Sequence, residues 1–181
     1  MVVVVNGMPR AGKSTFVAMC RAYKGHKAAQ EYSTVDYVKE LAMELGWNGE
    51  KTLRDRKFLS DLKALLTEWQ DIPYRKTLEW IKLTYRRNAS DYGLLHDDTC
   101  LFIHCREPEE IRRFKNDLGD DCVTVLVRRA EVENEKQSNR SDSEVFNFDY
   151  DYTIINNGTL DDLQGMAKHF LWTIGQGERK W

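Results

Sequence analysis

A short apolar run leads directly into a loop of small residues at the start of the chain. Val2 to Val5 are four consecutive valines, and Gly7-Met8-Pro9-Arg10-Ala11-Gly12-Lys13-Ser14 then matches the pattern G-x-x-x-x-G-K-[ST] in full. Four valines in a row are typical of a strand buried on both faces, as in a parallel sheet. The pattern therefore predicts a strand, a phosphate-binding loop and a helix from Ser14 to about Tyr23, which is the context that the motif requires.

Each fixed position of the motif in this loop has a mechanical role. Gly7 and Gly12 let the backbone curve so that successive N–H groups point inward as an anion nest. The positive end of the following helix also favours phosphate. Lys13 can reach the β- and γ-phosphates, and the Ser14 hydroxyl is a Mg²⁺ ligand. The loop therefore predicts binding of a triphosphate.

Strands and helices are expected to alternate along the rest of the chain. Further strands are predicted at about 28–32, 99–105, 121–127 and 151–155. Helices are predicted between them, with Ser33 and Thr159 as caps and Pro108 in a first turn. This order predicts a parallel, doubly wound α/β sheet, which binds ligands at the carboxyl ends of its strands.

Two successive helices between the second and third strands are expected to form an insertion on one side of the core. Each has apolar residues at helical spacing. These residues are Phe58, Leu59, Leu62, Leu65, Leu66 and Trp69 in the first helix, and Leu78, Trp80, Ile81 and Tyr85 in the second. Trp47, Trp69, Trp80 and Trp172 are expected in the core, and Trp181 in a disordered tail end.

Composition excludes several other classes of protein. The 181 residues carry 27 basic and 29 acidic side chains, a net charge of −2, which gives no case for polymeric nucleic acid or a membrane surface. No apolar run approaches the roughly 20 residues of a membrane helix. The four cysteines form no CxxC pair, so free thiols and a cytoplasmic location are expected. The polar, aperiodic stretch 128–148 is expected to be a mobile loop.

Among proteins with this loop, a small-molecule kinase fits best. No Asn-Lys-x-Asp stretch is present to read guanine. Phosphoryl transfer between two anionic partners depends on position and charge neutralisation, and a phosphate acceptor needs no general base. Basic residues at strand ends and in loops suit that chemistry, and they are Lys39, Arg54, Arg56, Arg106, Arg128, Arg129 and Arg140.

The chain resembles the deoxynucleoside monophosphate kinases and phosphomevalonate kinases of the P-loop superfamily. The similarity lies in GMPRAGKST, in STVDYVKELA followed by RDRKFLSDL, in LFIHCREPEEIRRFK and in DYDYTIINNGTLDDL. The resemblance implies a three-layer P-loop kinase fold in a single domain, 1–181. Its parts would be a core of about 1–32, 94–127 and 149–176, an acceptor-binding helical insertion of about 33–93, and a LID of about 128–148.

The resemblance also implies an activity and a set of site residues. ATP, with Mg²⁺, would phosphorylate a small phosphorylated acceptor such as a (deoxy)nucleoside monophosphate, in a monomer or homodimer. Acceptor binding would fall to Asp36, Lys39, Arg54 and Arg106, and catalysis to Lys13, Arg106, Arg128 and Arg140. The residues implied for ATP are Gly7, Arg10, Ala11, Gly12, Lys13, Ser14, Thr15, Asn157, Gly158 and Thr159, with Ser14 on the metal.

One departure from the family pattern keeps two alternatives open. His104-Cys105-Arg106 stands where the family commonly has an aspartate before the arginine. A histidine cannot supply the same charge near the metal, although Asp36, Asp97 or Asp98 could compensate. The chain could therefore be a non-catalytic nucleotide-binding module. It could also act on phosphomevalonate or another small metabolite, with Asp36 as the base if the acceptor is an alcohol.

A zinc site is not expected, although His96, Cys100, His104 and Cys105 lie close in sequence. The stretch Thr99–Cys105 is a predicted strand, in which successive side chains face opposite ways. His104 and Cys105 are therefore poorly arranged to share one ion.

Overall fold

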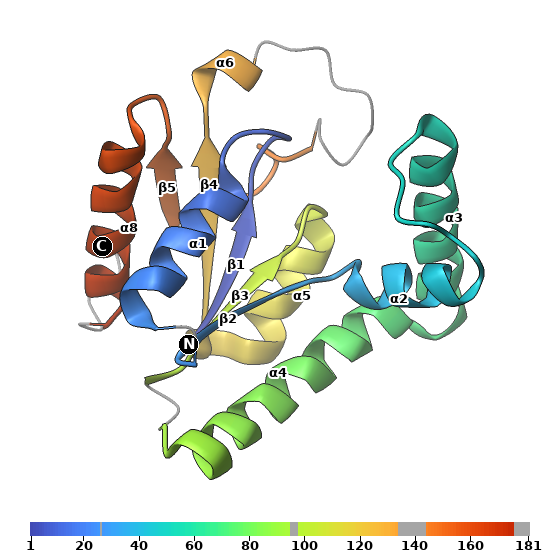
Figure 1. Ribbon diagram of the computed structural model, residues 1–181, viewed down its shortest axis with the longest axis horizontal. Coiled ribbons are helices and arrows are strands. Elements are labelled where there is room, and N and C mark those ends of the chain that lie inside the picture. Colours follow the sequence, from blue (N-terminus) through green and yellow to red (C-terminus); the bar gives the residue numbers. More distant parts are fainter. Residues whose placement is uncertain (26, 95–97, 134–143, 176–181) are drawn as a thin grey trace.

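Five parallel strands form one sheet in the computed structural model, which describes residues 1–25, 27–94, 98–133 and 144–175. The spatial order is β2-β3-β1-β4-β5 (Figure 1). All four strand pairs are parallel, so the predicted α/β sheet is confirmed. The strands are β1 (Val2–Asn6), β2 (Ala29–Ser33), β3 (Cys100–His104), β4 (Cys122–Arg128) and β5 (Tyr152–Ile155).

Helices cover both faces of the sheet, which explains the run of valines. Val3 and Val5 belong to the core cluster that α1 (Lys13–Lys24) and α8 (Leu160–Gly175) help to form. Val2 and Val4 belong to a second cluster on the other face, with residues of α4 (Ile72–Tyr92) and α5 (Pro108–Leu118). All four valines are at most 1% exposed, as expected of a strand buried on both sides.

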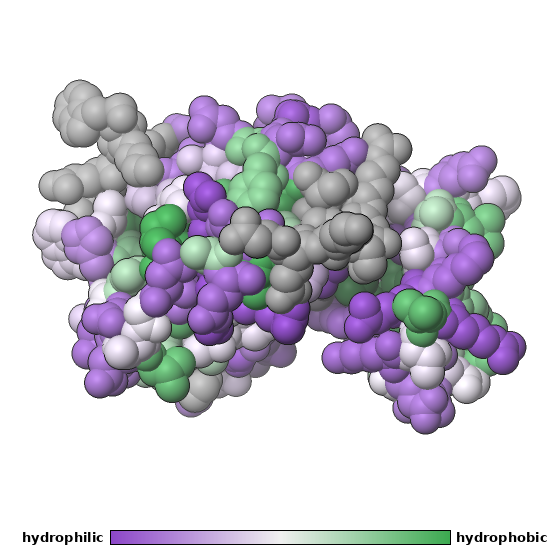
Figure 2. Space-filling view, turned by 90° about the horizontal axis from the view of Figure 1, so that it is seen from above, coloured by the Kyte–Doolittle hydropathy of each residue, from purple (hydrophilic) through white to green (hydrophobic). Residues whose placement is uncertain are grey.

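The helical insertion consists of α2 (Asp36–Glu44), α3 (Leu53–Gln70) and α4. The prediction that Trp69 of α3 lies in the core is wrong, and no residue of this fully described helix is buried. Leu65 and Trp69 are 63% and 72% exposed. The reason is that α3 packs on α2 and α4 rather than on the sheet, and it stands in a lobe to one side (Figures 1 and 2). Trp172 is also exposed, whereas Trp80 is half-buried and stacks on Tyr32.

Two predicted helix caps have different outcomes. At Thr159, the capping box with Asp162 is confirmed: Thr159 N–H donates to Asp162 Oδ2 (2.8 Å), and Asp162 N–H donates to Thr159 Oγ1 (3.2 Å). Ser33 does not cap α2, which begins at Asp36 after Val35. Instead the Asp36 carboxylate accepts a bond from the Ser33 N–H (2.7 Å), so the helix ties itself to the end of β2.

The stretch 128–148 is more ordered than a mobile loop where the structure describes it. A short helix, α6 (Ala130–Glu133), follows β4, and Val145 is fully buried in the core cluster of α1 and α8. Arg140, Asp97, His96 and Trp181 lie outside the described residues.

The expectations for the cysteines and for membrane helices are met within these limits. Cys20, Cys100, Cys105 and Cys122 are all free and buried. Among the helices of the described ranges, none combines the length and apolar character needed to cross a membrane.

Candidate active site

The glycine loop follows β1 at the carboxyl end of the sheet and is packed closely against neighbouring backbone. Gly7 and Gly12 have φ values of 148° and 97°. A Cβ atom on Gly7 would lie 2.2 Å from the Val127 carbonyl oxygen of β4, and one on Gly12 would lie 2.3 Å from Asn156 Nδ2. Only glycine fits at these positions, so the motif is a built loop and not an accidental glycine turn.

Lys13 lies across the mouth of this loop. Its Nζ donates to the carbonyl oxygens of Gly7 (2.6 Å) and Met8 (2.7 Å), and the Ala11 N–H bonds to the same Met8 oxygen (3.2 Å). Arg10 takes the left-handed conformation (φ 64°), which lets the chain turn inside the loop. The ammonium group is therefore held beside the amides of the loop, where an anion would be bound.

A cavity of about 460 Å³ opens between the loop and the turn from β5 to α8. Its volume is within the range of small-molecule sites. Three of its side chains are basic, and no aspartate or glutamate is among the described residues that line it, so the chemistry suits a polyanion. The lining residues are Arg10, Gly12, Lys13, Ser14, Thr15, Arg129, Asn156, Gly158, Thr159, Leu160 and Leu163.

Most residues predicted to bind ATP line this cavity, with three exceptions. Gly7 and Ala11 form the buried floor of the loop. Asn157 accepts a bond from the Ala130 N–H (2.8 Å) and so ties the turn to α6. Its neighbour Asn156, which was not predicted, lines the cavity and donates to the Ala11 carbonyl oxygen (2.9 Å). The sequence signal was the pair of asparagines before Gly158.

His104 at the end of β3 has a carboxylate beside it. Its Nε2 lies 3.2 Å from Glu31 Oε2 of β2, and the Glu31 carboxylate also forms an ion pair with Arg21 of α1. Glu31 was missed because the pairing of β2 with β3 cannot be deduced from the sequence alone. Asp98 cannot compensate for the missing aspartate, because it precedes β3 and so lies at the opposite end of the strand.

The residues predicted for the acceptor occupy the ends of β2 and β3 and the start of α3. Asp36 accepts from Lys39 Nζ (2.7 Å), one turn apart on α2, and Arg106 follows β3. Arg54 is nine residues, or two and a half turns, from Lys63, so it lies on the helix face opposite the one that contacts α5. Arg56 is seven residues from Lys63 and shares its face.

The predicted LID arginines have different surroundings. Arg128 forms two bonds with Glu133 of α6 (2.9 and 2.6 Å), and this pairing lowers the pKa of Glu133. Arg129 lines the cavity and pairs with Glu131. The described part of the loop thus turns Arg129, rather than Arg128, toward the glycine loop.

Lys63 joins the insertion to the core through a largely buried ion cluster. Its Nζ lies 2.9 Å from Glu107 and 3.1 Å from Glu110, at the start of α5, and the Cys105 thiol donates to Glu110 (3.3 Å). Burial alone would lower the pKa of Lys63, but the two carboxylates outweigh it and raise that pKa. The carboxylate oxygens of Glu107 and Glu110 and the Cys105 sulfur lie close enough together to hold a metal ion. Here the Lys63 ammonium group is the cation beside the two carboxylates.

Replacing Lys63 by Met should therefore destabilise the protein strongly. Glu110, with 12% of its side chain exposed, would lose its partner inside the structure, whereas Glu107 keeps 40% of its side chain in solvent. We therefore expect a loss near the lower end of the about 3–5 kcal/mol that breaking a buried pair costs. Lys57→Met on the same helix is the control, because the Lys57–Asp61 pair is exposed and should cost at most about 0.5 kcal/mol. Urea unfolding of both variants measures the difference. Equal free energies of unfolding would contradict the assigned role.

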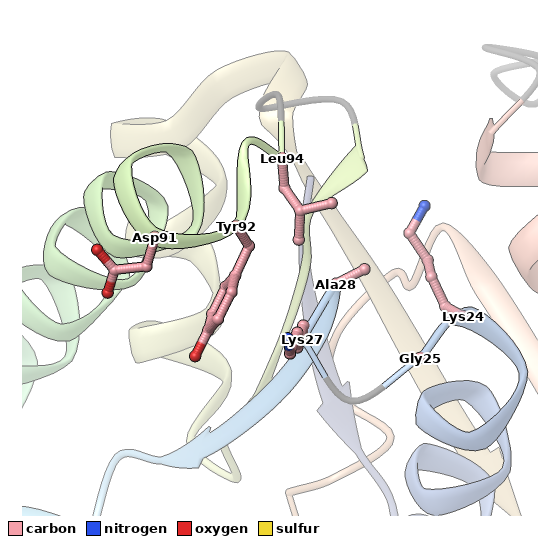
Figure 3. Close-up of a pocket in the computed structure, with 7 residues that line it drawn as sticks. All are labelled: Lys24, Gly25, Lys27, Ala28, Asp91, Tyr92 and Leu94. Atoms are coloured by element: carbon pink, nitrogen blue, oxygen red, sulfur yellow. The ribbon is translucent and has the colours of Figure 1, made fainter.

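A second cavity, of about 640 Å³, lies at the other end of the sheet (Figure 3). Gly25 at its edge ends α1, the helix whose first residue is Lys13, so the length of that helix separates this cavity from the glycine loop. None of the predicted site residues lines it. Its lining residues are Lys24, Gly25, Lys27, Ala28, Asp91, Tyr92 and Leu94.

Comparison with known proteins supports the fold. No protein-family model matches the sequence, and no curated protein matches it significantly. An unliganded sugar kinase from Janibacter sp. HTCC2649 aligns over 97% of this chain and 96% of its own, with a TM-score of 0.50 and 16% identity. Shikimate kinase from Aquifex aeolicus aligns over 99% and 100% (TM-score 0.48, 14% identity). The APS kinase of Mycobacterium tuberculosis, in complex with AMPPNP and APS, aligns over 94% and 96% (0.47, 16%).

These identities are too low to carry substrates from one protein to another. The structural similarity concerns the arrangement of the chain. The sheet order and the position of the glycine loop show that arrangement independently. The chain shares the α/β fold of the Janibacter sugar kinase, with a parallel sheet and its glycine loop after the first strand.

Proposed function

We propose that the chain is an ATP-dependent kinase that phosphorylates a small phosphorylated acceptor, giving ADP and the diphosphate. A (deoxy)nucleoside monophosphate is the proposed acceptor. The observation that carries the proposal is Lys13, held by two loop carbonyls at the mouth of a basic cavity of about 460 Å³. Such a loop at the start of a helix is an anion site by its geometry alone.

The residues around the loop fit a nucleotide with its metal. Loop amides and Lys13 would bind the phosphates, while Gly158 and Thr159 would border the base at the far side of the cavity. Ser14 is exposed in the first turn of α1, and its hydroxyl would hold Mg²⁺. Bound Mg²⁺ neutralises phosphate charge, and it usually takes few protein ligands besides the phosphates.

The acceptor would lie between the end of β3 and the insertion. In this proposal Arg106 neutralises the transferred group, Asp36 and Lys39 contact the acceptor, and Arg56 joins Arg54 as a candidate because it shares the face of Lys63. Arg129, Arg128 and Arg140 belong to the proposed LID of about 128–148. The proposed core and insertion boundaries stay as predicted, at about 1–32, 94–127 and 149–176, and about 33–93.

The surroundings of Asp36 favour a phosphate acceptor over an alcohol. Attack by an alcohol requires a base that can take its proton. Both Asp36 oxygens are occupied: Oδ1 by Lys39 Nζ and Oδ2 by the Ser33 N–H, each at 2.7 Å. These donors hold the Asp36 carboxylate in place, whereas a phosphate acceptor is already ionised and needs no base.

An acceptor screen tests this proposal. Purified protein with ATP and Mg²⁺ is assayed for ADP release with each dNMP, each NMP and phosphomevalonate. We expect ADP release that depends on at least one monophosphate, because the described residues around the site offer cations that suit a phosphate acceptor. Release with phosphomevalonate alone would move the assignment to that alternative acceptor.

A non-catalytic nucleotide-binding module is the second candidate, and His104 is the observation that favours it. The family pattern has a carboxylate at this position, and here the carboxylate that contacts His104, that of Glu31, is already paired with Arg21. ATP binding by calorimetry without acceptor-dependent ADP release would support the module and contradict the kinase.

A further inference from the structure

Asn6, the last residue of β1, connects three separate parts of the candidate site. Its side chain is fully buried. Oδ1 accepts from the Gly7 N–H of the glycine loop (2.8 Å). Nδ2 donates to the Arg106 carbonyl oxygen after β3 (3.1 Å) and to the Tyr150 hydroxyl (2.7 Å). These contacts cross 100 and 144 positions of sequence.

The pattern of donors and acceptors selects asparagine at this position. One oxygen faces an N–H, and one NH₂ group faces a carbonyl and a hydroxyl, so the reversed amide would set oxygen against the Arg106 carbonyl. A leucine of similar size would lose all three bonds and leave the Gly7 N–H without this partner in a buried place. The position thus needs an amide and not merely a small polar group.

Tyr150 extends the connection to the last residues of the predicted LID. Its hydroxyl accepts from Asn6 and donates to the Val145 carbonyl oxygen (2.8 Å). Burial raises the pKa of Tyr150 to about 12, so the hydroxyl keeps its proton and acts as a donor at neutral pH. Val145 is itself fully buried, which fixes that end of the segment in the core.

We propose that Asn6 and Tyr150 are positioning residues that hold the glycine loop, Arg106 and the segment 144–150 in register for phosphoryl transfer. The inference rests on the proposed kinase activity and goes beyond it by assigning a role to two residues that touch no phosphate. Displacement of reacting groups by about 1 Å can cost about 100-fold in rate. The buried Asn6 amide sets the distance between the glycine loop and the Arg106 backbone, so its loss would let these two parts shift relative to each other.

Tyr150→Phe is the main test, because it removes one hydroxyl and keeps the ring. Tyr74→Phe is the matched control: Tyr74 is 3% exposed, and its hydroxyl donates to Asp117 (2.8 Å) at the far end of α5 from Arg106. We expect similar losses of urea midpoint in the two variants. We expect kcat to fall about 10- to 100-fold and ATP affinity about 3-fold in Tyr150→Phe alone, with Tyr74→Phe within twofold of wild type.

Asn6→Leu should give a larger kcat loss than Tyr150→Phe, since it removes all three bonds. If Asn6→Leu fails to fold, the comparison of Tyr150→Phe with Tyr74→Phe still tests the inference. The inference is overturned if Tyr150→Phe keeps kcat and ATP affinity within twofold of wild type, or if Tyr74→Phe loses as much. If the wild type transfers phosphate to no acceptor, the proposed function fails separately, and calorimetry with ATP then tests the inference on the two tyrosine variants. A loss of ATP affinity of about threefold in Tyr150→Phe alone supports it, and affinity within twofold of wild type overturns it.

Discussion

Lys13→Ala is expected to lower phosphoryl transfer by about 10³-fold or more while the protein stays folded. Removing one group that stabilises charge at a transition state commonly costs 10²- to 10³-fold, and Lys13 would act on both the bound nucleotide and the transferred group. The side chain is half-buried and its Nζ donates to the carbonyl oxygens of Gly7 and Met8, so we expect the free energy of unfolding to fall far less than the rate of phosphoryl transfer. Steady-state kinetics and urea unfolding of the purified variant measure both quantities.

Lys24→Ala is the matched control for this prediction. Lys24 is the last residue of α1, and Lys13 is the first, so the two substitutions remove the same charge from the same helix. We expect Lys24→Ala to transfer phosphate at close to the wild-type rate. Near wild-type turnover in Lys13→Ala would refute the proposed mechanism.

Gly7→Ala is expected to cost both stability and nucleotide binding. The added Cβ would lie 2.2 Å from the backbone oxygen of Val127, which no rotamer change can relieve, and φ is +148°. Relief requires β1 and β4 to shift at the carboxyl end of the sheet, at a cost of about 3 kcal/mol. The shift would also open the loop that Lys13 spans, so ATP binding should fall below detection.

Gly25→Ala separates the clash from the backbone strain. Gly25 also has a positive φ, +93°, but a Cβ there would meet nothing within 4 Å. Only the strain of an L-residue in this conformation remains, about 1–2 kcal/mol, and ATP affinity should be unchanged. Equal losses of stability in the two variants, with ATP binding kept in Gly7→Ala, would contradict the packing described for the loop.

Local sequence signals were enough to predict the sheet and the glycine loop. The buried valines, the glycine spacing and the Thr159–Asp162 cap each depend on residues close together in sequence, and each is confirmed in the structure. The wrong prediction for Trp69 of α3 has a different origin. Its leucines have helical spacing, but periodicity shows only that a helix has an apolar side, not what covers it. Here other insertion helices cover part of that side and leave Trp69 exposed.

The unpredicted site residues depend on contacts between distant segments. Asn6 stands before a well-known motif but has no motif of its own, and its partners Arg106 and Tyr150 are fixed only once the strands are paired. Glu31 reaches His104 only because β2 lies beside β3. Strand order follows from the packing of the whole domain, so no local pattern could have placed these side chains together.

The central claim is that the glycine loop binds a polyphosphate through its amides and Lys13. Isothermal titration of the wild-type protein and of Lys13→Ala with ATP and Mg²⁺, with adenosine as the reference ligand, tests it most directly. We expect one ATP site, weakened at least 10-fold in Lys13→Ala, and no comparable binding of adenosine, because the phosphates would make most of the contacts with the loop. No detectable ATP binding by the wild-type protein, or equal affinity in the variant, would contradict the claim.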